Sequence, residues 1–274
     1  MPTPIPILDT IVVHADISGD RTDRFMSAAC YVARASELGT AVEQWNALLL
    51  EAGVTHFHAT DFFAFQKQFK GWHQTRDRHA DFERRFAAIA ANAGLLGCAT
   101  VVDNVAFGQD LMHLLDAEDR THPSNDPRIM SLMRCLVQAA NMLDRVRAPA
   151  QQMGSVLVFV EEEHGFGRYV TSFDESKKRG EKWTRWFRRI APASKLIAPV
   201  QMADLLAYEC WRRVADLEAN RNAPMRPAFK LLTTGAYDIQ VINEHETSVN
   251  ATLFRRILRD HPSVDTQNRP LMDT

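Results

Sequence analysis

Apolar runs along the chain predict strands that alternate with helices. The predicted strands cover residues 11–16, 25–33, 95–102 and 155–160 and part of 187–197, and residues 55–59 form a short strand or a loop. A turn at 18–20, which contains Gly19, separates the first two strands, so we expect them to form a hairpin. A hairpin followed by strand–helix alternation is typical of an α/β fold in which helices flank a mixed β-sheet.

Helical periodicity and end signals predict the helices. The stronger signals cover 36–51, 77–93, 127–147 and 199–219, and the weaker ones cover 103–116, 166–186 and 247–260. Ser36 is the expected N-cap of the first helix and Gly53 its stop, whereas Pro127 and Pro199 open two others. The polar residues 117–127 are predicted to form a loop. We assign 1–219 to one domain and 220–274 to a C-terminal extension packed on it.

Composition and charge restrict the possible partners. The chain has 274 residues, of which 46% are hydrophobic, and a formal net charge of −2. These values are ordinary for one globular α/β domain. A general nucleic-acid binder would be basic overall, so any contact with nucleic acid requires a local patch. The sequence contains no apolar stretch of ~20 residues and no signal peptide, so we expect no membrane segment and a cytoplasmic location.

Four cysteines occur, and no two of them are close in sequence. The absence of any CxxC pair argues against a zinc ribbon and against a disulfide framework. Apolar residues surround each cysteine, which predicts buried free thiols in a reducing compartment. The four are Cys30, Cys98, Cys135 and Cys210.

Three acidic positions stand out because each lies beside apolar structure. Asp204 lies in a mostly apolar helix and shares a helix face with Gln201, three residues before it. Asp16 ends the first strand, and Glu161 begins a run of three glutamates directly after the strand 155–160. A structural reading remains open for each: a pair between Asp204 and Arg212, a turn aspartate, and a solvated strand end.

Oxygen ligands of this kind favour Mg²⁺ or Mn²⁺. Two such ions ~4 Å apart can activate water and stabilise the leaving oxygen in phosphodiester cleavage. We therefore predict Asp16, Glu161 and Asp204 as metal ligands and catalytic residues, with Gln201 orienting Asp204 or a bound water. His58 is predicted to transfer a proton or to contact a phosphate.

A competing zinc site would use the two imidazoles of His56 and His58. On a strand these side chains share a face, and His73 or His79 would supply a third ligand. The spacing matches no tight zinc signature.

A basic stretch between Lys177 and Lys195 has a local net charge of +7 and contains interleaved tryptophans. Basic groups bind phosphates and aromatic rings stack on bases, so this stretch is a candidate nucleic-acid interface. The alternative is a solvated helix face whose aromatic rings turn inward. The candidate substrate-binding residues are Lys177, Lys178, Trp183, Arg185, Ser18, Ser194 and Gln201, with Trp186 beside them.

Four segments of the chain resemble motifs of the domain of unknown function 3800 family. They are residues 14–19 (HADISG), 56–59 (HFHA), 159–162 (FVEE) and 201–207 (QMADLLA), the last preceded by Ser194. The order and spacing agree over roughly residues 9–213. The resemblance implies a ribonuclease-H-like fold whose acidic residues form a metal site, and hence a nuclease or a related phosphoryl-transfer enzyme.

Two positions depart from the family pattern. Ile17 and His56 stand where the family usually has glutamate, so two acidic positions are lost. The other glutamates at 161–163 are candidates to compensate. These departures favour an alternative function, a catalytically inactive binding or regulatory module of the same fold in a mobile-element or phage-defence context.

Overall fold

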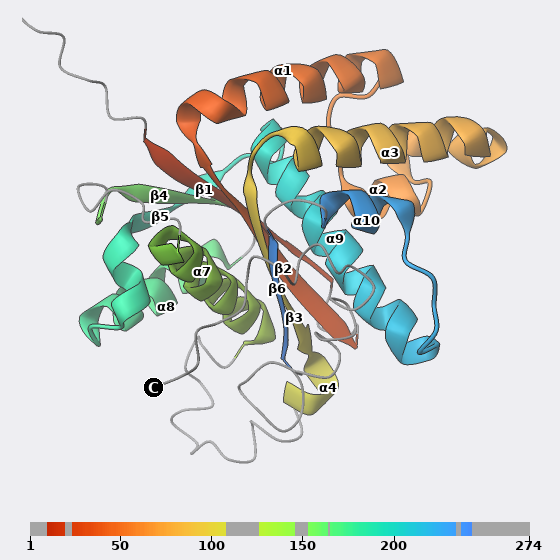
Figure 1. Ribbon diagram of the computed structural model, residues 1–274. Helices are drawn as coiled ribbons and strands as arrows, with labels where there is room; N and C mark the ends of the chain where they lie inside the picture. Colours follow the sequence, from red (N-terminus) through yellow and green to blue (C-terminus); the bar gives the residue numbers. More distant parts are fainter. Residues whose placement is uncertain are drawn as a thin grey trace, which may run out of the picture.

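The computed structural model describes residues 10–19, 24–107, 126–145, 153–163, 165–233 and 237–242. Their strands form a six-stranded sheet with the order β5-β4-β1-β2-β3-β6 (Figure 1). The β1–β2 and β2–β3 pairs are antiparallel, whereas the β1–β4, β4–β5 and β3–β6 pairs are parallel. The α/β class with a mixed sheet flanked by helices is therefore confirmed.

The elements have the following bounds. The strands are β1 (Ile11–Ser18), β2 (Phe25–Arg34), β3 (Leu96–Asp103), β4 (Val156–Glu161), β5 (Phe187–Ala193) and β6 (Tyr237–Ile242). The α-helices are α1 (Ala35–Ala52), α2 (Ala59–Phe63), α3 (Arg76–Asn92), α4 (Asn104–Ala106), α7 (Pro127–Arg145), α8 (Phe166–Lys178), α9 (Ala198–Ala219) and α10 (Pro227–Leu232). Short 3₁₀ helices are η1 (Lys67–Phe69), η2 (Trp72–Gln74) and η6 (Lys182–Trp186).

Each face of the sheet carries its own core. Side chains alternate along β1, so Val12 packs under α1, α3 and α9, whereas Val13 and Ala15 pack under α7 and α8. Figure 1 shows α1, α3, α9 and α10 on one side of the sheet and α7 and α8 on the other. This alternation also determines which face receives each polar side chain of β1.

Helix α9 is the central helix of the first face. Every residue from Ala198 to Cys210 is buried. The helix packs on β1 and β2 and is in turn covered by α1, α2, α3 and α10. A helix that is covered all round can place a carboxylate deep inside the protein only if that group finds polar partners.

Several end signals are confirmed, and two predictions are wrong. Gly53 ends α1 in the left-handed region with φ of 72°, and Pro127 and Pro199 lie in the first turns of α7 and α9. Ser36 is not an N-cap, because α1 follows β2 directly and starts at Ala35. The helix predicted over 166–186 ends at Lys178, and the chain then turns through Gly180 into η6.

The described residues after 220 contribute to the same sheet and core. Helix α10 packs against α3 and α9, and β6 extends the sheet beside β3. No strand was predicted there. Most of the loop predicted over 117–127, residues 108–116 of the helix predicted over 103–116 and all of the helix predicted over 247–260 lie outside the described residues.

The four cysteines are free and buried, as predicted. Among the described residues, no helix is long and apolar enough to cross a membrane.

Candidate functional site

Asp16 and Glu161 are neighbours on adjacent parallel strands. In the β1–β4 register, His14 pairs with Phe159 and Ala15 with Val160, so Asp16 and Glu161 occupy the next level. Val12 lies four residues before Asp16 and Phe159 lies two residues before Glu161, so each shares a strand face with the acidic residue. Both pack in the core between the sheet and α9. Asp16 and Glu161 therefore face α9 from the carboxyl ends of their strands, where ligands of α/β proteins commonly bind.

Asp204 reaches the same place from α9. Its carboxylate is buried, and Oδ2 accepts a hydrogen bond of 2.7 Å from the amide of Ala59, the first residue of α2. The three carboxyl groups interact: Asp16 hydrogen-bonds with Glu161 and with Asp204, and all three influence one another electrostatically. The sequence places these residues in three separate elements, and the fold brings them together.

Burial and mutual repulsion control the charge of this cluster. Burial raises the pKa of Asp16 well above its ordinary value, and the charges of Asp204 and Glu161 raise it further. Burial also raises the pKa of Asp204 to about 6, although the nearby His58 charge and the Ala59 amide act in the opposite direction. The raised pKa values therefore favour a proton retained by the cluster, and that proton belongs to the interacting carboxyl groups together.

Within the described part of the chain, no lysine or arginine forms an ion pair with any of the three. The open alternative for Asp204 was a pair with Arg212, but Arg212 lies 3.9 Å from Asp216 instead. Asp16 and Asp204 are buried and Glu161 is half-buried, so a cluster that no lysine or arginine neutralises favours a retained proton or a bound cation.

Gln201 holds the segment that carries the histidines. Its Oε1 accepts hydrogen bonds from the indole of Trp45 at 2.8 Å and from the amide of Phe57 at 2.9 Å. Its Nε2 donates to the carbonyl of Lys195 at 3.0 Å. The side chain is buried and engaged by the protein at both ends, so it acts on the positions of its neighbours. Its contacts do not favour the predicted role of binding substrate or orienting Asp204.

The two histidines of this segment have different surroundings. Nδ1 of His58 lies 3.1 Å from Oδ2 of Asp61, and its side chain is about one-third exposed. Nδ1 of His56 lies 3.0 Å from the hydroxyl of Thr55. Burial and the nearby charge of Lys195 lower the pKa of His56.

The zinc alternative gains no support from the described residues. His79 is buried against the ring of Phe62 at 4.1 Å and its Nε2 lies 3.2 Å from the Phe62 carbonyl. His73 lies against Phe65. No three His, Cys, Asp or Glu side chains in the described ranges are arranged to hold a metal ion as they stand.

His14 is a site residue that the sequence analysis did not single out. It lies two residues before Asp16 on the same strand face and stacks on Phe159, with ring centroids 5.1 Å apart. Burial lowers its pKa to about 4, so the imidazole is neutral at pH 7. Its Nδ1 is buried and has no hydrogen-bond partner among the described residues. The alternation of β1 was the signal that could have placed it beside Asp16.

The other acidic candidates and the Ile17 departure fall outside the cluster. Glu163 contacts Arg128 at 2.6 Å and Tyr169, so it is neutralised elsewhere, and Glu162 is exposed. Neither compensates for a lost ligand. Ile17 packs in the α7 core on the opposite face from Asp16. The side chain of a glutamate at position 17 would point to the face opposite Asp16. The absence of glutamate there therefore leaves this cluster intact.

The tryptophans of the basic stretch turn inward. Trp186 is buried and donates to Asp144 at 2.9 Å, and Trp183 packs between Phe173 and Phe187 while donating to Glu181. Arg185 also pairs with Asp144 at 2.6 Å. The expectation that Trp186 stacks on bases is therefore wrong.

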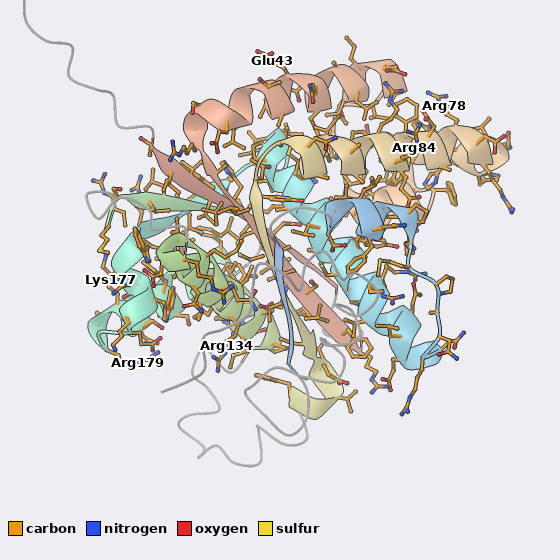
Figure 2. The ribbon with its side chains drawn as sticks, viewed as in Figure 1. Glu43, Arg78, Arg84, Arg134, Lys177 and Arg179 are labelled. Carbon is orange, nitrogen blue, oxygen red and sulfur yellow. The ribbon has the colours of Figure 1, made fainter. Side chains whose placement is uncertain are left out.

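The charged residues of the stretch lie away from the carboxyl cluster. Lys177 and Lys178 end α8, on the other side of the sheet from α9, and Figure 2 shows Lys177 and Arg179 there. The Lys177 ammonium donates to the Arg188 carbonyl at 3.2 Å. Of this stretch, Lys195 is the residue whose charge acts on His56 beside the cluster.

The two serines have separate positions. Ser18 is buried at the end of β1, opposite Ser27 of β2 and two residues beyond Asp16. The hydroxyl of Ser194 accepts from the amide of Leu196 at 3.2 Å and closes the turn before α9. Ser18 therefore lies beside the cluster, whereas Ser194 shapes the entry to α9.

Comparison with known proteins identifies no relative of this chain. No family model, curated protein or solved structure matches this chain.

Proposed function

We propose that this protein is a divalent-metal-dependent nuclease, or a related phosphoryl-transfer hydrolase, that acts on nucleic acid. The observation that carries the proposal is the convergence of Asp16, Glu161 and Asp204 from β1, β4 and α9. Asp16 and Asp204 are buried, and no lysine or arginine of the described residues forms an ion pair with either, so both are costly to keep ionised. A site of this composition is suited to a hard cation with oxygen ligands.

The strand order supports a ribonuclease-H-like fold as part of the same proposal. Strands β3-β2-β1-β4-β5 combine an antiparallel meander with two parallel strands added beside β1. This arrangement places the acidic residues of β1 and β4 next to each other. It agrees with the resemblance of the four sequence motifs to the domain of unknown function 3800 family.

The carboxylate oxygens are ligands of the kind that Mg²⁺ and Mn²⁺ prefer, although their present arrangement is not that of a metal site. The raised pKa values of Asp16 and Asp204 favour a proton held within the cluster. The orphaned Nδ1 of His14 on the same strand face also fits a site with a further occupant. Cation binding would replace the shared proton, so it would release protons and require the carboxyl groups to turn.

Each residue then has a defined task. Asp16, Glu161 and Asp204 would hold the cation, which when bound supplies activation of water and stabilisation of the leaving oxygen. The Ala59 amide fixes one oxygen of Asp204. Gln201 fixes the segment that presents His58, and His58 transfers a proton or contacts a phosphate.

The experiment is a cleavage assay with labelled single-stranded and double-stranded DNA and RNA. We expect the wild-type protein to cleave at least one of the four in the presence of Mn²⁺ or Mg²⁺ and to lose this activity in EDTA. Asp16→Asn, purified identically, controls for contaminating nucleases and should match the EDTA sample. Wild-type protein that cleaves none of the four in either metal would count against the proposal.

One observation favours the second candidate, the non-catalytic binding or regulatory module. The raised pKa of Asp16 favours a proton within the cluster, and no metal-ligand arrangement is preformed among the described residues. A protein that binds neither cation and cleaves no nucleic acid, while remaining folded, would fit this module.

A further inference from the structure

The buried carboxylate of Asp61 lies beside the candidate site but is not part of the acidic cluster. Its Oδ2 is 3.1 Å from Nδ1 of His58 and 3.0 Å from the ammonium of Lys67. Asp61 is 4% exposed, whereas Lys67 is largely open to solvent. Both partners of Asp61, the His58 imidazole and the Lys67 ammonium, lie against the same carboxylate oxygen. This shared contact restricts the orientations that the His58 ring can adopt.

We propose that Asp61 is the positioning residue of His58, an inference that rests on the proposed nuclease function. The Asp61 carboxylate, 3.1 Å from Nδ1, stabilises a proton on that nitrogen and thereby favours the Nδ1–H form of neutral His58. The unprotonated Nε2 is then the nitrogen left for a proton of the nucleophile or for a substrate group. The carboxylate–imidazole pair is the usual means of fixing the tautomer and orientation of a functional histidine.

The backbone places this pair against the acidic cluster. Ala59, the residue after His58, donates its amide to Asp204 at 2.7 Å. The charge of protonated His58 acts on Asp204 directly. The imidazole therefore lies close enough to the carboxylates to serve the same reaction, and its partial exposure leaves it accessible from solvent.

The loop after α2 is shaped to return Lys67 to Asp61. Phe65 and Lys67 have φ values of 55° and 46°, in the left-handed region that residues with side chains seldom adopt. The amide of Gln66 donates to the carbonyl of Asp61 at 2.8 Å and closes this turn. Unfavourable backbone of this kind is retained where it places a side chain that matters.

The Nδ1 proton is not aligned with the carboxylate in the resting geometry, although the distance is that of an ion pair. At 3.1 Å the negative charge of Asp61 favours a proton on Nδ1 even without that alignment. The tautomer of neutral His58 is therefore the quantity to measure. Stabilisation by Asp61 predicts the Nδ1–H form, whereas a ring without this influence is expected in the Nε2–H form.

Long-range ¹H–¹⁵N NMR of the full chain, free of metal and nucleic acid, measures the tautomer. His58→Gln assigns the resonances among the histidines. We expect neutral His58 to carry its proton on Nδ1 in the wild type and to change predominantly to the Nε2–H form in Asp61→Ala. Asp174→Ala, an exposed aspartate of α8, is the matched control and should leave the His58 signals unchanged.

A predominant Nε2–H form in the wild type would overturn the proposal, and this result needs no variant to fold. A folded Asp61→Ala protein that keeps the wild-type tautomer would overturn it as well.

The kinetic readout separates this proposal from the proposed function. In Asp61→Asn we expect kcat to fall by about tenfold to a hundredfold, with KM and Mn²⁺ affinity changed less than about twofold. An unchanged kcat would contradict the positioning role while the nuclease function stands. Wild-type protein without cleavage would remove the nuclease function, and the tautomer alone would then decide whether Asp61 positions His58.

Discussion

Replacing Gln201 with Leu is expected to lower the free energy of unfolding by roughly 4 kcal/mol, because each of two buried donors left unpaired costs about 1–3 kcal/mol. The donors are the indole of Trp45 and the amide of Phe57, which share Oε1 of Gln201. The carbonyl of Lys195 also loses the Nε2 donor. Urea unfolding followed by tryptophan fluorescence measures the change.

Gln44→Leu is the matched control for this substitution. Gln44 is exposed on α1, so the same chemical change there should alter stability by less than about 0.5 kcal/mol. If Gln201→Leu were as stable as this control, the hydrogen bonds around Gln201 would not hold the histidine segment. The side chain would then be available for the substrate-binding role that the sequence favoured.

The metal-free protein should lose stability relative to Asp204→Asn as the pH rises from about 4 to about 6. Burial raises the pKa of Asp204 from 3.8 to about 6 in the folded state, so the folded protein binds this proton more tightly than the unfolded chain. The stabilising contribution is complete below pH 4 and is lost as the pH passes the folded pKa. At about 1.4 kcal/mol for each pKa unit, the difference reaches roughly 3 kcal/mol.

Asn resembles the neutral acid in shape and does not titrate, so the comparison measures the contribution of Asp204 together with its effect on the pKa of Asp16. Urea unfolding of both proteins at intervals between pH 4 and pH 8, in EDTA, gives the difference directly. Asp16 contributes in the same direction, because its pKa is also raised by burial and by the same neighbours. A difference in unfolding free energy that stays flat across this range would show that Asp204 is not buried as a proton-sharing group.

The sequence predicted the residues of the acidic cluster better than the contacts that hold it. Asp204 lies in an apolar helix, and Asp16 and Glu161 end apolar strands, so local patterns alone marked all three. Alternation along β1 puts Asp16 on the same face as Val12, which packs in the core beneath α9. Such local signals were sufficient because each carboxylate lies next to apolar residues, which bury Asp16 and Asp204 and partly cover Glu161.

The remaining contacts depend on residues far apart in the chain. Trp45 and Gln201 are 156 residues apart, and nothing near either one indicates the other. Asp61 follows His58 by three residues at the start of a short helix, a spacing that could have drawn attention to it. Charge density near Lys177 was misleading because the aromatic residues there, including Trp186, face the core under α7 and α8.

The central claim is that Asp16, Glu161 and Asp204 form one cation site, and Mn²⁺ calorimetry of the metal-free protein tests it most directly. The titrations use wild type, Asp204→Asn and Glu162→Gln, the last being an exposed glutamate adjacent to Glu161. We predict binding by the wild type and by Glu162→Gln, none by Asp204→Asn, and a binding enthalpy that depends on the buffer because protons are released. Folded wild-type protein that binds no Mn²⁺, or equal binding by Asp204→Asn, would contradict the account.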